Sequence, residues 1–317
     1  MMRALDNGFQ EAVAIVSDAS ATADRLCRVL GYGRLWEGAP ARESLDLLGV
    51  PADWQAHEVL IGDAAQGRGY IRLLAFPGRD TGVMRDGAQP WDTGGIFDIN
   101  IRALRSIETL YRGMTQAGFA GFAPITAWDF GPVSVKEVVS RDGDGVCIAF
   151  MERVAPPLQG FEAVTGPASY VFNSTQVVAD FDAARTFYTE VMGWKPVQES
   201  QWAHEAGFNC MGLPLDVART RQIRVGIYHP HGRMEGSLEI IAFEGEGLDF
   251  ANASPPDRGW ASLRFPVRDV DGVVGRAAAA GCAVQPRRSF LLAPYGEVEA
   301  AGLVTPWGAR LEAFRAL

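Results

Sequence analysis

Glu239 is the residue whose surroundings point most directly to chemistry in this sequence. It lies within SLEIIAFEG, residues 237–245, where Leu238, Ile240 and Ile241 flank its carboxylate. A charge is costly to bury among such side chains unless it is paired or used. Burial also raises the pKa of a carboxyl group, which suits a general base that removes a proton next to a carbonyl. Glu239 is therefore a candidate catalytic residue.

Aromatic side chains are the second group of candidates. Trp128, Trp202 and Trp260 fall in predicted loops or strands that could line a cleft. Apolar walls with a few polar groups are typical of small-molecule sites, although core packing is the alternative for each tryptophan. Residues 202–219 form an irregular glycine-containing insert, which we expect to fold over a cleft as a lid.

The elements that must position these residues can be read from STQVVADFDAARTFYTEVMGWKP, residues 174–196. A β-branched run predicts a strand, and Asp180 can cap the following helix. The helix carries an apolar stripe and stops at Gly193. The same order of strand, helix and glycine recurs at residues 13–32, 97–118 and 261–281. The sequence therefore contains four copies of one unit.

Short strands complete each unit. Residues 70–78 are similar in sequence to residues 237–245. Further short strand candidates follow the helices of the second and fourth copies. The predicted fold class is α+β, with four βαβββ modules forming two curled mixed β-sheets, or half-barrels, with helices outside. We predict two glyoxalase-like domains of two modules each, at 1–155 and 165–317, joined by the turn-rich PPLQG segment.

This repeat resembles the vicinal oxygen chelate superfamily, which includes glyoxalase, bleomycin-resistance proteins and extradiol ring-cleaving dioxygenases. The resemblance implies metal ligands in the cleft, with a His or Gln on the first strand and a Glu on the last strand of each unit. Those positions fall on Asn173, Glu239, Ser262 and Glu312 in the C-terminal half, on Glu11 and Arg72 in the first module, and near Ile96 and on Ala149 in the second.

In the C-terminal half, two of the implied ligands are carboxylates and none is an imidazole. We therefore expect no tightly bound transition metal and no required cofactor. A magnesium or calcium ion, which prefers oxygen ligands, is a possible occupant of Asn173, Glu239 and Glu312. Glu11 and Arg72 would attract each other, either as an ion pair replacing a lost metal site or as an anchor for a polar substrate group.

Glu239 and Glu312 have two interpretations. If both line one metal-free cleft, desolvation and mutual repulsion raise at least one pKa and make a general base. Alternatively, Asn173 and Ser262 bind them by hydrogen bonds and the pair is a remnant of an ancestral site. In the first case Asn173, Ser262, Glu11, Arg72, Trp128, Trp202 and Trp260 are the predicted ligand-binding residues.

The composition limits the partners. The chain has 317 residues, 48% of them hydrophobic, and a formal net charge of -9. No basic run suggests nucleic-acid binding, no apolar run is long enough for a membrane span, and the N-terminus lacks a signal-peptide core. We expect a cytoplasmic protein, with a homodimer as a possible assembly.

The predicted function is binding, and possible transformation, of a small organic molecule in the C-terminal cleft without a tightly bound transition metal. The enzyme alternative is a metal-dependent glyoxalase-like lyase or isomerase, or a ring-cleaving dioxygenase. A third alternative is an interaction module that pairs its sheet edges with another chain.

Overall fold

The computed structural model describes residues 8–203, 209–214, 218, 221–245 and 247–317. Within them the four predicted modules are present. Module 1 consists of β1 (Glu11–Ile15), α1 (Ala19–Leu30), β2 (Gly33–Gly38), α2 (Arg42–Leu48), β3 (His57–Gly62) and β4 (Tyr70–Ala75). Module 2 consists of β5 (Asp98–Ala103), α3 (Ile107–Gln116), β6 (Ala120–Gly121), β7 (Thr126–Phe130), β8 (Val133–Arg141) and β9 (Cys147–Ala155).

The second half of the chain repeats this order. Module 3 consists of β10 (Ala168–Val177), α4 (Phe181–Thr186), the π-helical turn η1 (Phe187–Val191), β11 (Lys195–Ala203), β12 (Gln222–His229) and β13 (Ser237–Phe243). Module 4 consists of β14 (Gly259–Pro266), α6 (Val270–Ala279), β15 (Ala283–Val284), β16 (Arg288–Leu292), β17 (Gly296–Val304) and β18 (Arg310–Ala316). Among the described residues, no helix has the length and apolar character needed to cross a membrane.

Side-chain caps explain why the first helix of each module begins where it does. Asp18, Asp180 and Asp269 each accept a hydrogen bond from the backbone N–H three residues ahead, and Ser106 does the same in module 2. Such caps satisfy donors that the first helical turn leaves without a partner. At the other end of α1, Gly31 has a φ of 74°, a left-handed conformation that favours glycine.

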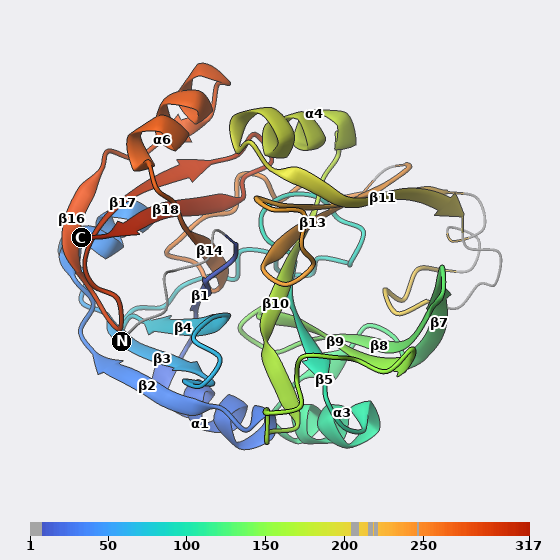
Figure 1. The fold of residues 1–317 in the computed structure, drawn as a ribbon. Coiled ribbons are helices and arrows are strands. Elements are labelled where there is room, and N and C mark those ends of the chain that lie inside the picture. The colour runs from blue at the N-terminus through green and yellow to red at the C-terminus, as the bar shows by residue number, and fades with distance from the viewer. Residues whose placement is uncertain (1–7, 204–208, 215–217, 219–220, 246) are drawn as a thin grey trace.

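The sheets combine modules from both halves of the sequence. β1 pairs antiparallel with β14, and β10 pairs antiparallel with β5. Modules 1 and 4 therefore form one nine-stranded sheet, called sheet I here, and modules 2 and 3 form another, called sheet II. Figure 1 shows the blue N-terminal strands grouped with the red C-terminal strands, and the green strands grouped with the olive ones. The α+β prediction of two curled mixed sheets is confirmed.

This pairing corrects the expectation that modules 1 and 2 would share a sheet, and modules 3 and 4 another. The two connections that follow β4 and β13 cross between the sheets and lie side by side. Thr93 N–H donates to Leu248 O at 2.9 Å, and Leu248 N–H donates to Asp92 Oδ1 at 2.8 Å. The sequence break at residues 156–164 thus falls between modules 2 and 3, which share a sheet. Independent folding of 1–155 and 165–317 stays a prediction.

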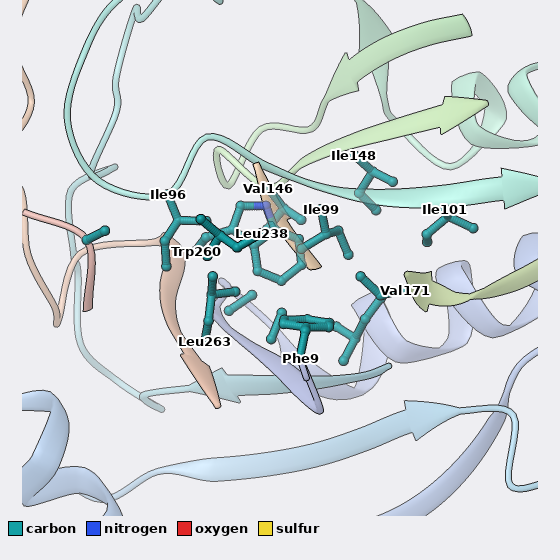
Figure 2. Close-up of a cluster of buried hydrophobic side chains, with 14 of the residues drawn as sticks. Phe9, Ile96, Ile99, Ile101, Val146, Ile148, Val171, Leu238, Trp260 and Leu263 are labelled. Atoms are coloured by element: carbon teal, nitrogen blue, oxygen red, sulfur yellow. The ribbon is translucent and has the colours of Figure 1, made fainter. Parts of the chain in front are cut away.

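The main core joins the two sheets. Its buried side chains come from both sheets and from α1, α3, α4 and α6. Figure 2 shows Phe9, Trp260 and Leu263 of the sheet I modules close to Ile99 and Val171 of sheet II. Because this cluster is continuous, the relative position of the two sheets is fixed by apolar burial.

Helix α2 is an exception to the prediction that the helices lie outside. Leu45 and Leu48 pack against Val13 and Ile15 of β1, while Leu47 packs in a cluster with Tyr295. These partners belong to the concave side of sheet I, so α2 fills its hollow. The two half-barrels therefore differ: sheet I is plugged by its own chain, whereas sheet II has no α2 equivalent among its described elements.

Candidate functional site

The concave side of sheet I holds a buried network of five charged residues. Arg72 Nε lies 2.7 Å from Glu11 Oε1, and a second Arg72 nitrogen contacts Glu58. Arg264 Nη1 lies 2.6 Å from Glu11 Oε1, and Arg264 Nε lies 2.8 Å from Glu312 Oε2. The ion pair predicted between Glu11 and Arg72 is present, and it is part of a larger network that links modules 1 and 4.

Neighbouring hydroxyl groups complete this network. Tyr295 donates to Glu11 at 2.9 Å, Ser262 donates to Glu312, and Ser44 of α2 accepts from Arg264 at 2.9 Å. Burial alone would raise the pKa of Glu11, but the two arginines lower it to about 2. The Glu11 carboxylate is therefore held in the ionised form by fixed partners. The buried ion pairs make this network a structural core and a poor site for a general base.

Sheet II has a different concave surface. Asn173 on β10 stands opposite Asn100 on β5 and Ser237 on β13. Asn100 Nδ2 donates to Asn173 Oδ1 at 3.1 Å, and Asn173 Nδ2 donates to Ser237 Oγ at 2.8 Å. Asn173 therefore binds these two neighbours, and the hydrogen bond expected from Asn173 to Glu239 is absent from the described contacts.

A row of carboxyl groups lies beside these amides. Thr175 on β10 stands opposite Asp98 on one side and Glu239 on the other. Burial, with the nearby charges of Asp98 and Glu137, raises the pKa of Glu239 from 4.5 to about 8. Burial and the charge of Glu137 likewise raise the pKa of Asp98 to about 7. Both groups thus titrate near neutral pH, as acid–base catalysts do.

No residue that the structure describes forms a hydrogen bond or an ion pair with the Glu239 side chain. Glu137 is different, because Trp128 Nε1–H donates to its Oε2 at 2.9 Å and the Cys210 thiol donates at 3.3 Å. Burial raises the pKa of Glu137 as well. Three carboxyl groups with raised pKa values therefore share the hollow of sheet II, and Glu239 alone among them lacks a donor within the described residues.

Apolar side chains line the rest of this hollow. Phe97, Val139, Ala149 and Val177 form a buried cluster with Cys147, and the partly buried residues Phe122, Met211 and Phe243 pack against it. The insert predicted as a lid, residues 202–219, lies partly outside the described residues. In its described part, Cys210 reaches Glu137 and Met211 packs on clusters of both modules. This part of the insert therefore packs beside the carboxyl group of Glu137, and its role as a lid stays a prediction.

The structure separates the residues that the sequence placed in one C-terminal cleft. Glu239 and Asn173 belong to sheet II, whereas Glu312 and Ser262 belong to sheet I. The expected repulsion between Glu239 and Glu312 is therefore wrong, and the hydrogen bond from Ser262 to Glu312 is confirmed. The pairing of modules across the halves is the reason for this correction.

The three tryptophans predicted to bind ligand lie in different parts of the structure. Trp128 binds Glu137 in sheet II, and Trp202 packs against the apolar cluster of β12 and β13. Trp260 is buried at the junction of the sheets, where its Nε1–H donates to Cys147 O at 2.8 Å. Within the described contacts, Trp128 is the predicted tryptophan that reaches a carboxyl group of sheet II.

Sequence reasoning missed Asp98, Asn100 and Glu137. The predicted metal-ligand position of module 2 was placed near Ile96, whereas the polar side chains of β5 that face the concave surface are Asp98 and Asn100. The segment DINIRA, residues 98–103, alternates polar and apolar side chains. This alternation was a visible signal, because it places Asp98 and Asn100 on one face of the strand.

The fit of a metal ion can be tested on these side chains. In sheet I, guanidinium groups lie between the carboxylates, so the positive charges already occupy the space of a cation. In sheet II, the Asn173 amide is engaged by Asn100 and Ser237. Across residues 8–203, 209–214, 218, 221–245 and 247–317, no three His, Cys, Asp or Glu residues are grouped to hold a metal. The described donors therefore do not fit the transition-metal site that the resemblance implies.

Comparison with known proteins agrees with this architecture. Residues 170–290 match the family model of the Glyoxalase/Bleomycin resistance protein/Dioxygenase superfamily. The chain is similar to glyoxalase I from Zea mays, with 14% identity, a TM-score of 0.63, and coverage of 98% of this chain and 92% of that one. No curated protein sequence matches the chain.

A second solved structure shares the fold. The putative dioxygenase from Bacillus subtilis subsp. subtilis str. 168 has 14% identity, a TM-score of 0.59, and coverage of 98% of this chain and 86% of that one. At such identities the likeness concerns the fold alone. Together with the family match, it confirms the resemblance to the vicinal oxygen chelate superfamily.

Proposed function

We propose that the hollow of sheet II binds a small organic molecule and moves a proton on it, with Glu239 as the catalytic group and no tightly bound transition metal. The observation that carries this proposal is the Glu239 carboxyl group, which has a pKa of about 8 and no hydrogen-bond or ion-pair partner involving a described residue. A carboxyl group left in this state suits proton exchange with a ligand. The family match over residues 170–290 supports a small-molecule ligand.

Asp98 is the second proton-transfer group in this proposal. Near neutral pH the pair shares protons unevenly, because the Asp98 pKa is about 7 and the Glu239 pKa is about 8. Glu239 can therefore donate a proton to an oxygen while ionised Asp98 accepts one, or the two can exchange roles in the reverse direction. This balance corresponds to proton transfer next to a carbonyl, as in enolisation.

Residues around Glu239 and Asp98 also have roles in this proposal. The apolar cluster of Phe97, Val139 and Val177 would hold the body of the ligand and exclude water. Trp128 and Cys210 hold Glu137 in place, so Glu137 acts as a fixed neighbour that raises the pKa of the other two carboxyl groups. Glu312 of sheet I has no part in this proposal, because Arg264 and Ser262 bind it.

The test is proton exchange observed on candidate ligands. Purified protein is incubated in D₂O with a panel of small ketones, aldehydes and hydroxy acids, and NMR follows loss of the signal next to each carbonyl. We expect exchange with the wild type, loss of exchange in Glu239→Gln, and retained ligand binding in that variant by thermal shift. The matched control is Glu297→Gln on β17, which removes an exposed carboxylate of sheet I.

Two results would overturn the proposal. One is exchange that persists in both Glu239→Gln and Asp98→Asn. The other is stoichiometric zinc, nickel, manganese or iron in the purified protein together with loss of exchange on chelation, which would favour the metal-dependent lyase, isomerase or dioxygenase alternative. Binding with no exchange in any protein would leave a sequestering function. The cytoplasmic location and the possible homodimer stay predictions.

A further inference from the structure

A chain of hydrogen bonds crosses sheet II from β13 to β5. The Ser237 hydroxyl donates to Met234 Sδ at 3.8 Å, so its oxygen serves as the acceptor for Asn173 Nδ2 at 2.8 Å. The Asn173 amide oxygen then faces β5, where it accepts from Asn100 Nδ2 at 3.1 Å. Each amide is thereby oriented by its neighbour, and the nitrogen of Asn100 is directed towards Asp98.

The Asn100 amide nitrogen has two further acceptors. It lies 3.1 Å from Asp98 Oδ1 and 2.9 Å from Thr175 Oγ1. A reversed Asn100 amide would place its oxygen beside the Asp98 carboxylate, and neither group would then supply a hydrogen. All three side chains are buried, so water is largely excluded from these contacts. The Asn100 amide therefore favours the ionised form of Asp98.

Thr175 makes the two carboxyl groups unequal, because it has a single hydroxyl hydrogen. Its oxygen accepts from Asn100, and its side chain gives the hydrogen to Asp98. Glu239 stands on the opposite side of Thr175 and receives no hydrogen bond from a described residue. Hydrogen bonds to the charged form of a carboxyl group lower its pKa. The hydroxyl of Thr175 thus stabilises a charge on Asp98 and not on Glu239.

We propose that Thr175 and Asn100 are positioning residues for the proton transfer, which hold Asp98 as the ionised base and leave Glu239 as the protonated acid. This inference rests on the proposed function and adds the direction of the transfer. Asp98 takes the proton from the carbon next to the carbonyl, and the electron pair of that C–H bond forms the C=C bond of the enol. The carbonyl oxygen receives the proton of Glu239. Return of both protons regenerates the starting state.

Other titratable groups also face this pair. Burial is the largest influence and raises the pKa of both members; Glu137 on β8 raises both as well, whereas Arg85, from the connection after β4, lowers the pKa of Asp98. The Cys147 and Cys210 thiols lie close to Asp98, and burial raises their pKa values well above 9, so they stay neutral while the pair titrates. Because Arg85 acts in the same direction as the threonine hydroxyl, the test changes the hydroxyl and leaves Arg85 in place.

The test follows the two carboxyl groups separately by NMR in the ligand-free full chain. The side-chain carboxyl carbons of Asp and Glu are enriched in ¹³C, and Asp98→Asn and Glu239→Gln assign the two signals. We expect wild-type midpoints that report a pKa of about 7 for Asp98 and about 8 for Glu239. Thr175→Val keeps the branched shape and removes the hydroxyl, so the Asp98 midpoint should rise by roughly one pH unit. Thr175→Ser should return it to the wild-type value.

Two further variants support this measurement. Asn100→Ala removes the amide and should also raise the Asp98 midpoint, which keeps the test decisive where Thr175→Val folds poorly. The matched control is Thr305→Val. Thr305 is a buried threonine that follows β17 in sheet I, and its hydroxyl oxygen accepts from Ala309 N–H at 3.0 Å. Loss of this hydroxyl should leave both midpoints unchanged.

The pH profile of the D₂O exchange gives a second readout. Its acidic limb depends on ionised Asp98, so Thr175→Val should move that limb upward by the same interval and Thr305→Val should not. An Asp98 midpoint that is unchanged in both Thr175→Val and Asn100→Ala, or a wild-type Glu239 midpoint below that of Asp98, would overturn the inference. Shifted midpoints without exchange on any ligand would overturn the proposed function and leave the positioning of Asp98 supported.

Discussion

Asp98 and Glu239 flank Thr175 from its two sides, one contributed by each half of the sequence. β5 pairs with β10 on one side and β13 pairs with it on the other, so both carboxyl groups point to the same face of sheet II. Like charges so placed disfavour simultaneous ionisation. The pairing of modules across the halves thus creates an acid–base pair that neither half contains alone.

The first prediction concerns stability against pH. The folded-state pKa of Glu239 is raised from 4.5 to about 8, so its contribution to stability is complete below pH 4.5 and is lost as pH rises through 8. Glu239→Gln keeps the shape of the neutral acid. We expect the variant to be more stable than the wild type by roughly 1–3 kcal/mol above pH 8 and equal to it near pH 4. Urea unfolding at both pH values measures the difference.

An exposed carboxylate provides the control for this experiment. Glu297→Gln removes a charge of the same kind from an exposed position on β17, so the two unfolding curves should stay together at every pH. A Glu239→Gln variant that is less stable than the wild type at high pH would show that Glu239 is ionised and well solvated in the folded protein. That result would remove the basis of the proposed function.

The second prediction uses Trp128 as a reporter. Its Nε1–H donates a hydrogen bond to Glu137. Burial raises the pKa of Glu137 above the ordinary value of 4.5. Protonation of Glu137 changes the charge next to the indole, so the tryptophan emission should titrate with a midpoint above 4.5. Glu137→Gln and Trp128→Phe should each abolish this component, whereas Trp202→Phe should leave it. A titration unchanged in Glu137→Gln would assign it to another group.

The third prediction concerns the sheet I network. The pKa of Glu11 is lowered from 4.5 to about 2, so its contribution to stability is complete above pH 4.5 and is lost as pH falls through 2. Glu11→Gln leaves Arg72 and Arg264 undercompensated in the interior. We expect a loss of roughly 3–5 kcal/mol at pH 7, which shrinks as the pH falls below 4.5.

Two further variants keep this measurement interpretable. Tyr295→Phe removes only the hydroxyl that donates to Glu11, and should cost about 1 kcal/mol in the same urea experiment. Glu37→Gln removes an exposed partner of Arg34 and should change stability little. A loss no larger for Glu11→Gln than for Glu37→Gln would mean that the buried network adds nothing to stability.

Local structure was largely predictable from the sequence, and the pairing of modules was not. The caps at Asp18 and Asp180 and the left-handed Gly31 and Gly193 depend on signals within a few residues. Helix α1 ends at Leu30, next to Gly31, whereas the helix after Asp180 is α-helical to Thr186 and π-helical over Phe187–Val191. The choice of β14 and not β5 as the partner of β1 depends on how the long connections cross. No local pattern records that choice, so Glu239 and Glu312 were placed in one cleft.

The site was half predictable for the same reason. Glu239 was found because apolar neighbours on one strand mark a buried charge. Asp98 and Glu137 reach it from another module, and their proximity follows from the register between β5 and β10 and from the curl of sheet II. The alternation in DINIRA shows which side chains share a face, but it does not show which carboxylate faces them.

The last prediction tests the pairing of modules directly. The first strands β1 and β5 of residues 1–155 find their antiparallel partners β14 and β10 in residues 165–317. The N-terminal half alone leaves these edges open and also separates Glu11 from Arg264. We therefore expect 1–155 expressed alone to aggregate or to lack a cooperative thermal transition. The two halves expressed together should co-purify as a 1:1 complex with the circular dichroism of the intact chain. A folded, monomeric 1–155 with a sharp transition would instead show that modules 1 and 2 can share a sheet, as the sequence alone suggested.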